Sequence, residues 1–139
     1  MKKIALFAVL FTVVIFTSCG SAKGEQPQQI LTGKTWQVKS INGTDVSMTE
    51  STPYINFGTD NKVSGKGGCN SFSGSYNLNQ EGGINMSRLV STKMACPGLD
   101  IEGRFFKALE KANMTKITND KLVLMDGVKE IMVLTPKPE

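Results

Sequence analysis

Short runs of apolar or alternating residues, separated by turn residues, follow one another along the chain from Thr35 onward. Apolar and polar side chains that alternate with a period of two are typical of strands with one buried face. Two of the runs are followed by Asn42-Gly43 and Asp126-Gly127, pairs that tolerate the positive φ angles of two-residue hairpin turns. We therefore expect an antiparallel sheet with hairpin connections. Its strands are predicted at residues 36–41, 54–57, 71–78, 84–86, 115–118, 122–125 and 128–134.

Residues 100–113 follow a different period. Their apolar members recur three or four positions apart, and charged residues occupy the other positions. This spacing predicts one amphipathic helix that packs with its apolar side against the sheet. The apolar positions are Ile101, Phe105, Ala108, Leu109 and Ala112. The expected fold is therefore α+β and mainly antiparallel β, with a compact, barrel-like or strongly curved sheet and one amphipathic helix packed against it.

The first 18 residues have the pattern of a secretory signal peptide. Lys2 and Lys3 form a short positive region, and residues 4–16 are apolar except for Thr12. A helix of this length spans roughly 20 Å, which is short of the roughly 30 Å hydrocarbon core of a bilayer. We therefore expect the segment to be cleaved, not to persist as a membrane-spanning helix.

Cys19 directly follows this leader. The small residues Thr17 and Ser18 precede it, and Phe16 stands where a lipobox more often has Leu. The arrangement resembles the lipobox that lipoprotein signal peptidase reads. We expect cleavage before Cys19 and lipid on its thiol, because two or three acyl chains anchor a protein stably to a membrane. The alternative is a soluble secreted protein in which Cys19 merely lies near the cut.

Residues 19–30 are predicted to tether the domain to the membrane. They are mostly small and polar and include Pro27, a composition typical of a flexible linker. No acidic cluster follows the lipidated cysteine. The predicted location is the periplasmic face of the outer membrane, with display on the cell surface as the alternative.

The remaining chain has the length and composition of one globular domain. Removal of the leader leaves 121 of the 139 residues, and 40% of the whole chain is hydrophobic. We assign the domain to residues 31–135 and a short C-terminal tail to residues 136–139.

Charge and the absence of histidine exclude several functions. After the leader is removed, the chain has 14 basic and 12 acidic residues, and the basic residues are scattered along the sequence. We therefore expect no binding of nucleic acid. The chain has no His, which is the usual general base of Ser and Cys enzymes and the commonest metal ligand. We therefore expect no catalytic residues, no metal and no cofactor.

Cys69 and Cys96 are the two cysteines that remain once Cys19 carries lipid. An exported domain with an even pair of cysteines normally oxidises it, so we expect one disulfide. Closure of the loop between them would stabilise the fold by roughly 3 to 4 kcal/mol. The alternative is a reactive thiol at Cys69.

A glycine-rich segment, Gly65-Lys66-Gly67-Gly68, precedes Cys69. It does not fit a phosphate-binding P-loop, because Asp60 and Gly67 occupy the positions where that motif has Gly and Ser or Thr. We interpret the segment as a glycine-rich turn or bulge where two stretches of backbone pass closely.

Two longer segments then suggest a family. VSGKGGCNSFSGSY at residues 63–76 and STKMACP at residues 91–97 resemble the signature of the META domain, also called the HslJ-like family. The resemblance extends over residues 31–134, with Lys93 where the family more often has Arg. The motif residues are Gly65, Gly67, Gly68, Asn70, Gly74, Tyr76, Thr92, Met94 and Pro97.

The resemblance implies a compact, mostly antiparallel β domain with one helix, often carried by envelope lipoproteins, some of them linked to heat shock or envelope stress. It implies no catalytic residues, and it also favours Cys69 and Cys96 as a structural pair. Our first hypothesis is a non-enzymatic, lipid-anchored protein that binds an envelope partner or ligand and supports envelope integrity. The alternatives are a protease inhibitor, a carrier of a small apolar ligand, and an enzyme that works through Cys69 or through Lys or Asp groups.

Overall fold

The computed structural model describes residues 26–97 and 99–138 of the chain. The predicted signal peptide, Cys19 and most of the predicted tether lie outside the described residues. Two helices and nine strands follow one another in this part of the chain. They are α1 (Pro27–Leu31), β1 (Thr35–Ile41), β2 (Thr44–Asp45), β3 (Tyr54–Phe57), β4 (Lys62–Lys66), β5 (Ser71–Leu78), β6 (Ile84–Ser91), α2 (Leu99–Lys111), β7 (Met114–Ile117), β8 (Leu122–Asp126) and β9 (Lys129–Pro136).

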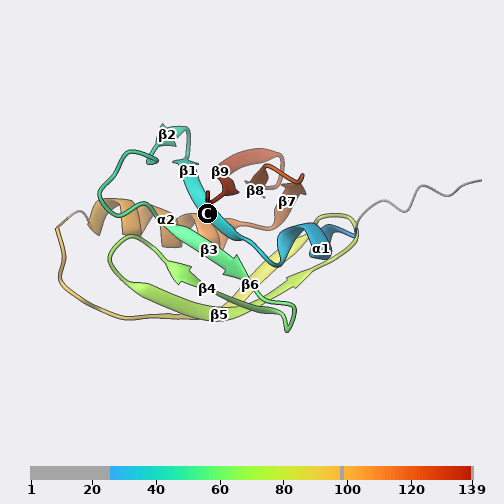
Figure 1. Cartoon of the computed structure of the whole chain (residues 1–139), viewed down its shortest axis with the longest axis horizontal. Coiled ribbons are helices and arrows are strands. Elements are labelled where there is room, and N and C mark those ends of the chain that lie inside the picture. The colour runs from blue at the N-terminus through green and yellow to red at the C-terminus, as the bar shows by residue number, and fades with distance from the viewer. Residues whose placement is uncertain (1–25, 98, 139) are drawn as a thin grey trace, which may run out of the picture.

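The strands form one strongly curled antiparallel sheet (Figure 1). Their order across it is β6-β5-β4-β3-β1-β9-β8-β7, and β2 pairs with β1 at one side. At one point the two ends of this order meet, because Gly83 and Met114 form a bridge and the Thr115 amide donates to the Gly82 carbonyl at 2.7 Å. The sheet curls into a half-barrel whose two edges meet at this bridge. This architecture confirms the predicted fold class.

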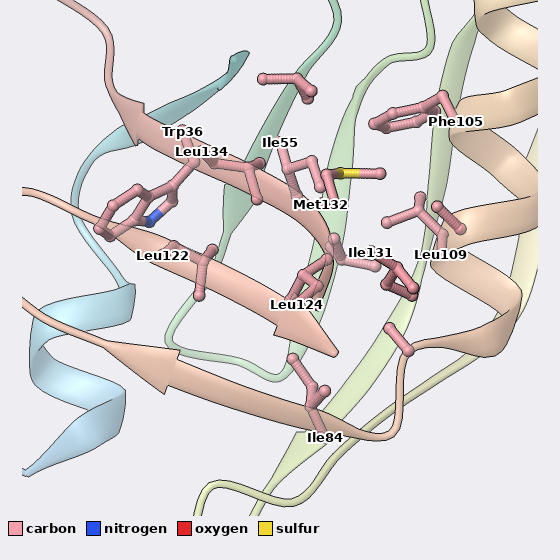
Figure 2. Close-up of a cluster of buried hydrophobic side chains, with 14 of the residues drawn as sticks. Trp36, Ile55, Ile84, Phe105, Leu109, Leu122, Leu124, Ile131, Met132 and Leu134 are labelled. Atoms are coloured by element: carbon pink, nitrogen blue, oxygen red, sulfur yellow. The ribbon is translucent and has the colours of Figure 1, made fainter. Parts of the chain in front are cut away.

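Helix α2 closes the half-barrel by packing against β1 and β8. Its buried residues Phe105 and Leu109 meet the sheet residues Leu124, Ile131 and Met132, all at most 4% exposed (Figure 2). Side chains therefore fill the interior between the helix and the sheet. Burial of each large apolar side chain contributes about 1.5–3 kcal/mol relative to exposure.

Helix α1 precedes the position at which the domain was predicted to begin. Pro27 fits the first turn of a helix, where its missing N–H group removes no hydrogen bond. Leu31 is fully buried, and the Trp36 side-chain Nε1 donates to the Leu31 carbonyl at 2.8 Å. Residues 27–30, assigned to the flexible tether from their composition, therefore belong to the folded part of the chain.

Strand β4 is the main element that the sequence pattern missed. Residues 62–66 lie between β3 and β5 and pair with both, although the predicted glycine-rich turn begins within them, at Gly65. Val63 is buried while Lys62 and Ser64 are exposed, so the period of two is present. Because glycine has a low strand propensity, the sequence pattern did not identify these residues as a strand.

Candidate functional site

Gly65 shows why a strand here must carry glycine. A Cβ atom at this position would overlap the Tyr54 carbonyl oxygen and lie 2.9 Å from the Phe72 ring. Gly65 pairs with Ile55 on β3 and with Phe72 on β5. The predicted close passage of two backbones is therefore present, but within a strand and not in a turn or bulge.

Gly67 and Gly68 form the turn that follows β4. The Gly67 amide donates to the Asn70 carbonyl at 2.9 Å, and Gly68 has a φ of 141°, which favours glycine. A Cβ atom on Gly67 would lie 2.9 Å from the Phe106 ring of α2. The absence of a side chain lets the turn lie directly against helix α2.

Asn70, itself 3% exposed, lies at the centre of a partly buried network of hydrogen bonds. Its Oδ1 accepts bonds from Thr92 Oγ1 at 2.8 Å and from the Met94 amide at 2.7 Å. Its Nδ2 donates to Glu102 Oε1 at 2.7 Å, and its backbone N–H donates to Glu102 Oε2 at the same distance. One side chain thus joins the β4–β5 turn to helix α2 and to the segment between β6 and α2.

The two cysteines also join the β4–β5 turn to the segment between β6 and α2. Cys69 and Cys96 lie at disulfide distance, as predicted, with their Cα atoms 6.3 Å apart. Both side chains are only partly buried. The disulfide and the Asn70 network hold residues 92–97 against the body of the domain.

A surface groove of about 680 Å³ lies beside this disulfide. Both cysteines line it, together with Met94 and Pro97 from the segment after β6. Met48, in the connection between β2 and β3, also lines the groove. Met48 is 94% exposed and Met94 is 55% exposed, so two flexible apolar side chains border one hollow. We call this hollow the disulfide groove.

Most of the motif residues lie at this groove or in the Asn70 network. Gly68, Met94 and Pro97 line the groove with the two cysteines, while Asn70 and Thr92 belong to the hydrogen-bond network that holds Met94. Met48 and Glu102 were not predicted, because a loop residue and a residue on the polar side of a helix carry no local signal of these contacts. Lys93 lies in a neighbouring hollow with Met94 and Phe106.

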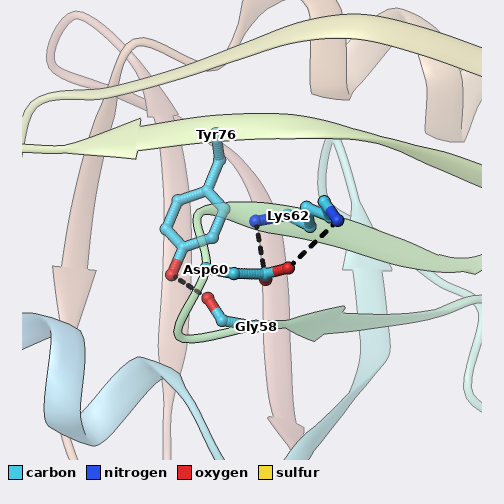
Figure 3. A network of polar contacts seen from close by, with 4 residues as sticks. All are labelled: Gly58, Asp60, Lys62 and Tyr76. Carbon is cyan, nitrogen blue, oxygen red and sulfur yellow. Dashed lines mark hydrogen bonds and ion pairs between the residues drawn. The ribbon is translucent and has the colours of Figure 1, made fainter.

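Gly74 and Tyr76 do not take part in the groove. Gly74 faces an irregularity in β6, where Arg88 has a φ of 54°, and a Cβ atom would lie 2.9 Å from the Ser87 carbonyl oxygen. Tyr76 is 1% exposed, and its hydroxyl donates to the Gly58 carbonyl at 2.8 Å (Figure 3). Both residues serve the packing of strand β5.

The turn beside Tyr76 carries an exposed ion pair. Asp60 Oδ2 lies 3.3 Å from Lys62 Nζ, and Asp60 Oδ1 accepts from the Lys62 amide at 3.3 Å (Figure 3). Partial desolvation raises the pKa of Asp60, but the hydrogen bonds and charge of Lys62 outweigh it and hold that pKa below its usual value. Asp60 thus stabilises the turn between β3 and β4 through its contacts with Lys62.

Replacement of Tyr76 by Phe is expected to lower the free energy of unfolding by about 1 kcal/mol at pH 7, the usual net value of one hydrogen bond. Burial raises the pKa of the Tyr76 phenol in the folded protein. Its contribution is therefore complete below the unfolded pKa of about 10 and is lost as pH rises above that value. Urea unfolding at pH 7 and pH 10.5 measures both effects. An equal alkaline loss in Tyr76→Phe would contradict this role.

Comparison with known proteins decides the family. The profile of the META domain matches residues 29–139. The chain belongs to the META domain family. No match was found among curated protein sequences.

Three solved structures share the fold of this META domain. One NMR structure is 26% identical over 78% of this chain and 92% of its own, with a TM-score of 0.63. An NMR structure of a protein from Burkholderia xenovorans is also 26% identical, covering 81% and 87%, with a TM-score of 0.60. A DUF4847 family protein from Bacteroides vulgatus is 16% identical, covering 81% and 98%, and its TM-score of 0.60 concerns the fold alone.

Neither a metal-binding cluster nor a membrane-spanning helix is present in the part of the META domain that the structure describes. Within residues 26–97 and 99–138, no group of three acidic or cysteine side chains could hold a metal ion. Neither of the two described helices is long and apolar enough to cross a membrane.

Proposed function

We propose that this META domain protein is anchored to the outer membrane by lipid on Cys19 and binds an envelope partner through the disulfide groove. It acts without catalysis and supports envelope integrity, particularly under stress. The exposure of Met48 and Met94, which both line the groove, carries the proposal of partner binding.

The sequence around Cys19 supports the anchor. A positive region, an apolar stretch and small residues stand in order before that cysteine. The pair formed by Cys69 and Cys96 supports export independently, because structural disulfides form and persist in oxidising compartments.

The chemistry of the groove favours a protein partner. Methionine side chains adapt to different surfaces because they are unbranched and polarisable, and they recur at binding surfaces that accept varied sequences. Glu50 and Lys66 also line the groove and supply one charge of each sign beside its apolar part. A partner segment with apolar side chains and flanking charges would match this arrangement.

The position of the groove suits a tethered protein. In Figure 1, helix α1 lies at one end of the domain, and residues 92–97 with the β2–β3 connection lie at the other. The predicted tether enters at α1. A chain held by lipid on Cys19 would therefore present the disulfide groove away from its own attachment point.

Photo-crosslinking in living cells tests this function. A photoreactive amino acid replaces Met48 or Met94, and Val128, which is 96% exposed but does not line the groove, is the matched control position. We expect the same partner protein to be crosslinked from both groove positions and not from Val128. Loss of that product when Cys19→Ser is added would connect binding to the anchor. Equal products from all three positions, or none, would contradict partner binding through the groove.

A carrier of a small apolar ligand is the second candidate. The groove volume of about 680 Å³ lies within the usual range for small-molecule sites. The interior of the half-barrel is filled by core side chains, so a carried ligand would lie in this groove. A retained small molecule in the native mass spectrum of protein extracted from membranes would favour this function.

A further inference from the structure

A second hollow, chemically different from the groove, lies between helix α2 and the β8–β9 hairpin. Its volume is about 160 Å³. Arg104, Lys107 and Lys111 line it from the helix, and Lys129 lines it from the start of β9. We call it the cationic recess.

Helical geometry gathers the cations of the recess. Residues 104, 107 and 111 are three and four positions apart, so they share one face of α2. Ala108 lies on the same face and is 3% exposed, and Ile131 on β9 is 4% exposed. Figure 2 shows Ile131 between β9 and α2. The recess therefore has an apolar floor and a cationic rim.

Backbone and side-chain hydrogen bonds hold the other segments that line the recess. The Asn42 amide in the β1–β2 turn donates to the Ile131 carbonyl at 2.8 Å. In the hairpin, Asp126 pairs with Lys129, and Asn113 Nδ2 donates to Asp126 Oδ1 at 3.1 Å. The cations of the rim therefore lie on helix α2 and on the β8–β9 hairpin, and the bond between Asn113 and Asp126 joins the ends of these two elements.

Positive charge in the recess exceeds the negative charge available to balance it. Asp126 is the one carboxylate that lines the recess, and it already accepts the bond from Asn113. Arg104 forms an exposed ion pair with Asp100 at 2.9 Å. Among the described residues, no carboxylate oxygen lies within 4.0 Å of the amines of Lys107, Lys111 or Lys129. The helix dipole favours a cation at Lys111, near the end of α2, but it does not explain the other two.

We propose that the cationic recess binds a phosphate group. Ammonium and guanidinium groups form short, charge-assisted hydrogen bonds with phosphate oxygens, and the planar fork of Arg104 suits two of them. A volume of about 160 Å³ is below the usual 300–1,000 Å³ of sites that enclose a whole organic ligand. The recess therefore takes one anionic group, and the rest of its molecule lies outside.

The phosphate can come from a free ion or from the headgroup of a phospholipid. Protein purified as cells make it from the full-length gene is titrated with inorganic phosphate against chloride at equal ionic strength. It is also titrated with mixed micelles that contain phosphatidylglycerol or, for comparison, zwitterionic phosphatidylcholine. The measurement is the change in the amide NMR signals of Asn42, Ala108 and Ile131.

Two variants with matched changes in charge control for general screening. Lys107→Gln/Lys111→Gln/Lys129→Gln removes three of the four cations of the rim and keeps Arg104, and Lys39→Gln/Lys116→Gln/Lys121→Gln removes three exposed lysines outside the recess. We expect the first variant to bind at least about tenfold more weakly, because each change removes a charge-assisted bond, and the second to bind as the unmodified protein does.

Each outcome of the titration decides the proposal. Signal changes with inorganic phosphate indicate a site for the free ion, and changes with phosphatidylglycerol alone indicate a lipid headgroup. No change with either probe would overturn the proposal, as would equal weakening in both triple variants. The unmodified protein alone gives the first result, so the proposal stays testable if a variant does not fold.

Discussion

Replacement of both Cys69 and Cys96 by Ser is expected to lower the free energy of unfolding by roughly 3 to 4 kcal/mol. The bond spans a sequence separation of 27 residues, and its loss releases that loop in the unfolded chain. Loss of the disulfide also leaves the Asn70 network as the only one of the two links that still holds residues 92–97 against the domain. For a domain whose total stability is of order 5 to 15 kcal/mol, this is a large fraction. Urea unfolding of both proteins without reductant measures the difference.

Reductant is the matched control for the cysteine variant. Dithiothreitol should lower the urea midpoint of the unmodified protein to that of the double variant and leave the variant unchanged. If reductant and the two substitutions both left the midpoint where it was, the pair would not be a stabilising disulfide.

Replacement of Asn70 by Ala is expected to lower the free energy of unfolding by about 3 kcal/mol. The change removes the partners of Thr92 Oγ1 and the Met94 amide. It also leaves Glu102 Oε1 without its side-chain donor, in a site where lost hydrogen bonds are not fully replaced by water. Thermal and urea unfolding measure the loss.

Asn85→Ala is the matched control for the Asn70 variant, because Asn85 is an exposed residue of β6. Its expected effect is within about 0.5 kcal/mol. Backbone hydrogen exchange adds a local measurement, with faster exchange at Thr92 and Met94 expected in Asn70→Ala alone. Equal stability of the two variants would show that the Asn70 network does not hold the segment.

The strands were predictable from sequence where turn chemistry and alternation agree. Asn42 and Gly43 both have positive φ, as the turn predicted after residues 36–41 requires, although strand β2 beyond that turn was not predicted. Residues 54–57 and 71–78 are strands with the predicted bounds. These features depend on neighbours in the sequence, and the period of two expresses them directly.

Helix α2 was predicted with an end two residues too far along the chain. Ala112 still donates to the Ala108 carbonyl at 3.0 Å, but the Asn113 amide donates to Met125 of β8 at 2.9 Å. Asn113 thus leaves the helix because β8 offers its backbone a partner. Such a contact between distant segments cannot be deduced from helical periodicity.

The groove itself could be predicted only in part. The family resemblance selected Asn70, Thr92 and Met94, but it did not indicate that Glu102 holds Asn70 from a helix that begins 29 residues later in the chain. Glu102 looked like a solvent-facing residue, since its partners lie in another segment. Met48 belongs to a loop whose position depends on the folded sheet, so its exposure beside the disulfide appears only in three dimensions.

Intact-mass spectrometry of the protein purified from cell membranes tests the central claim, export with lipid on Cys19 and pairing of the other two thiols. The sample is treated with a thiol-alkylating reagent without prior reduction. We predict a chain that begins at Cys19, carries the added mass of a diacylglycerol with or without a further acyl chain, and takes up no alkyl group. A chain that keeps its first 18 residues, bears no acyl group and is alkylated at Cys69 and Cys96 would contradict the account.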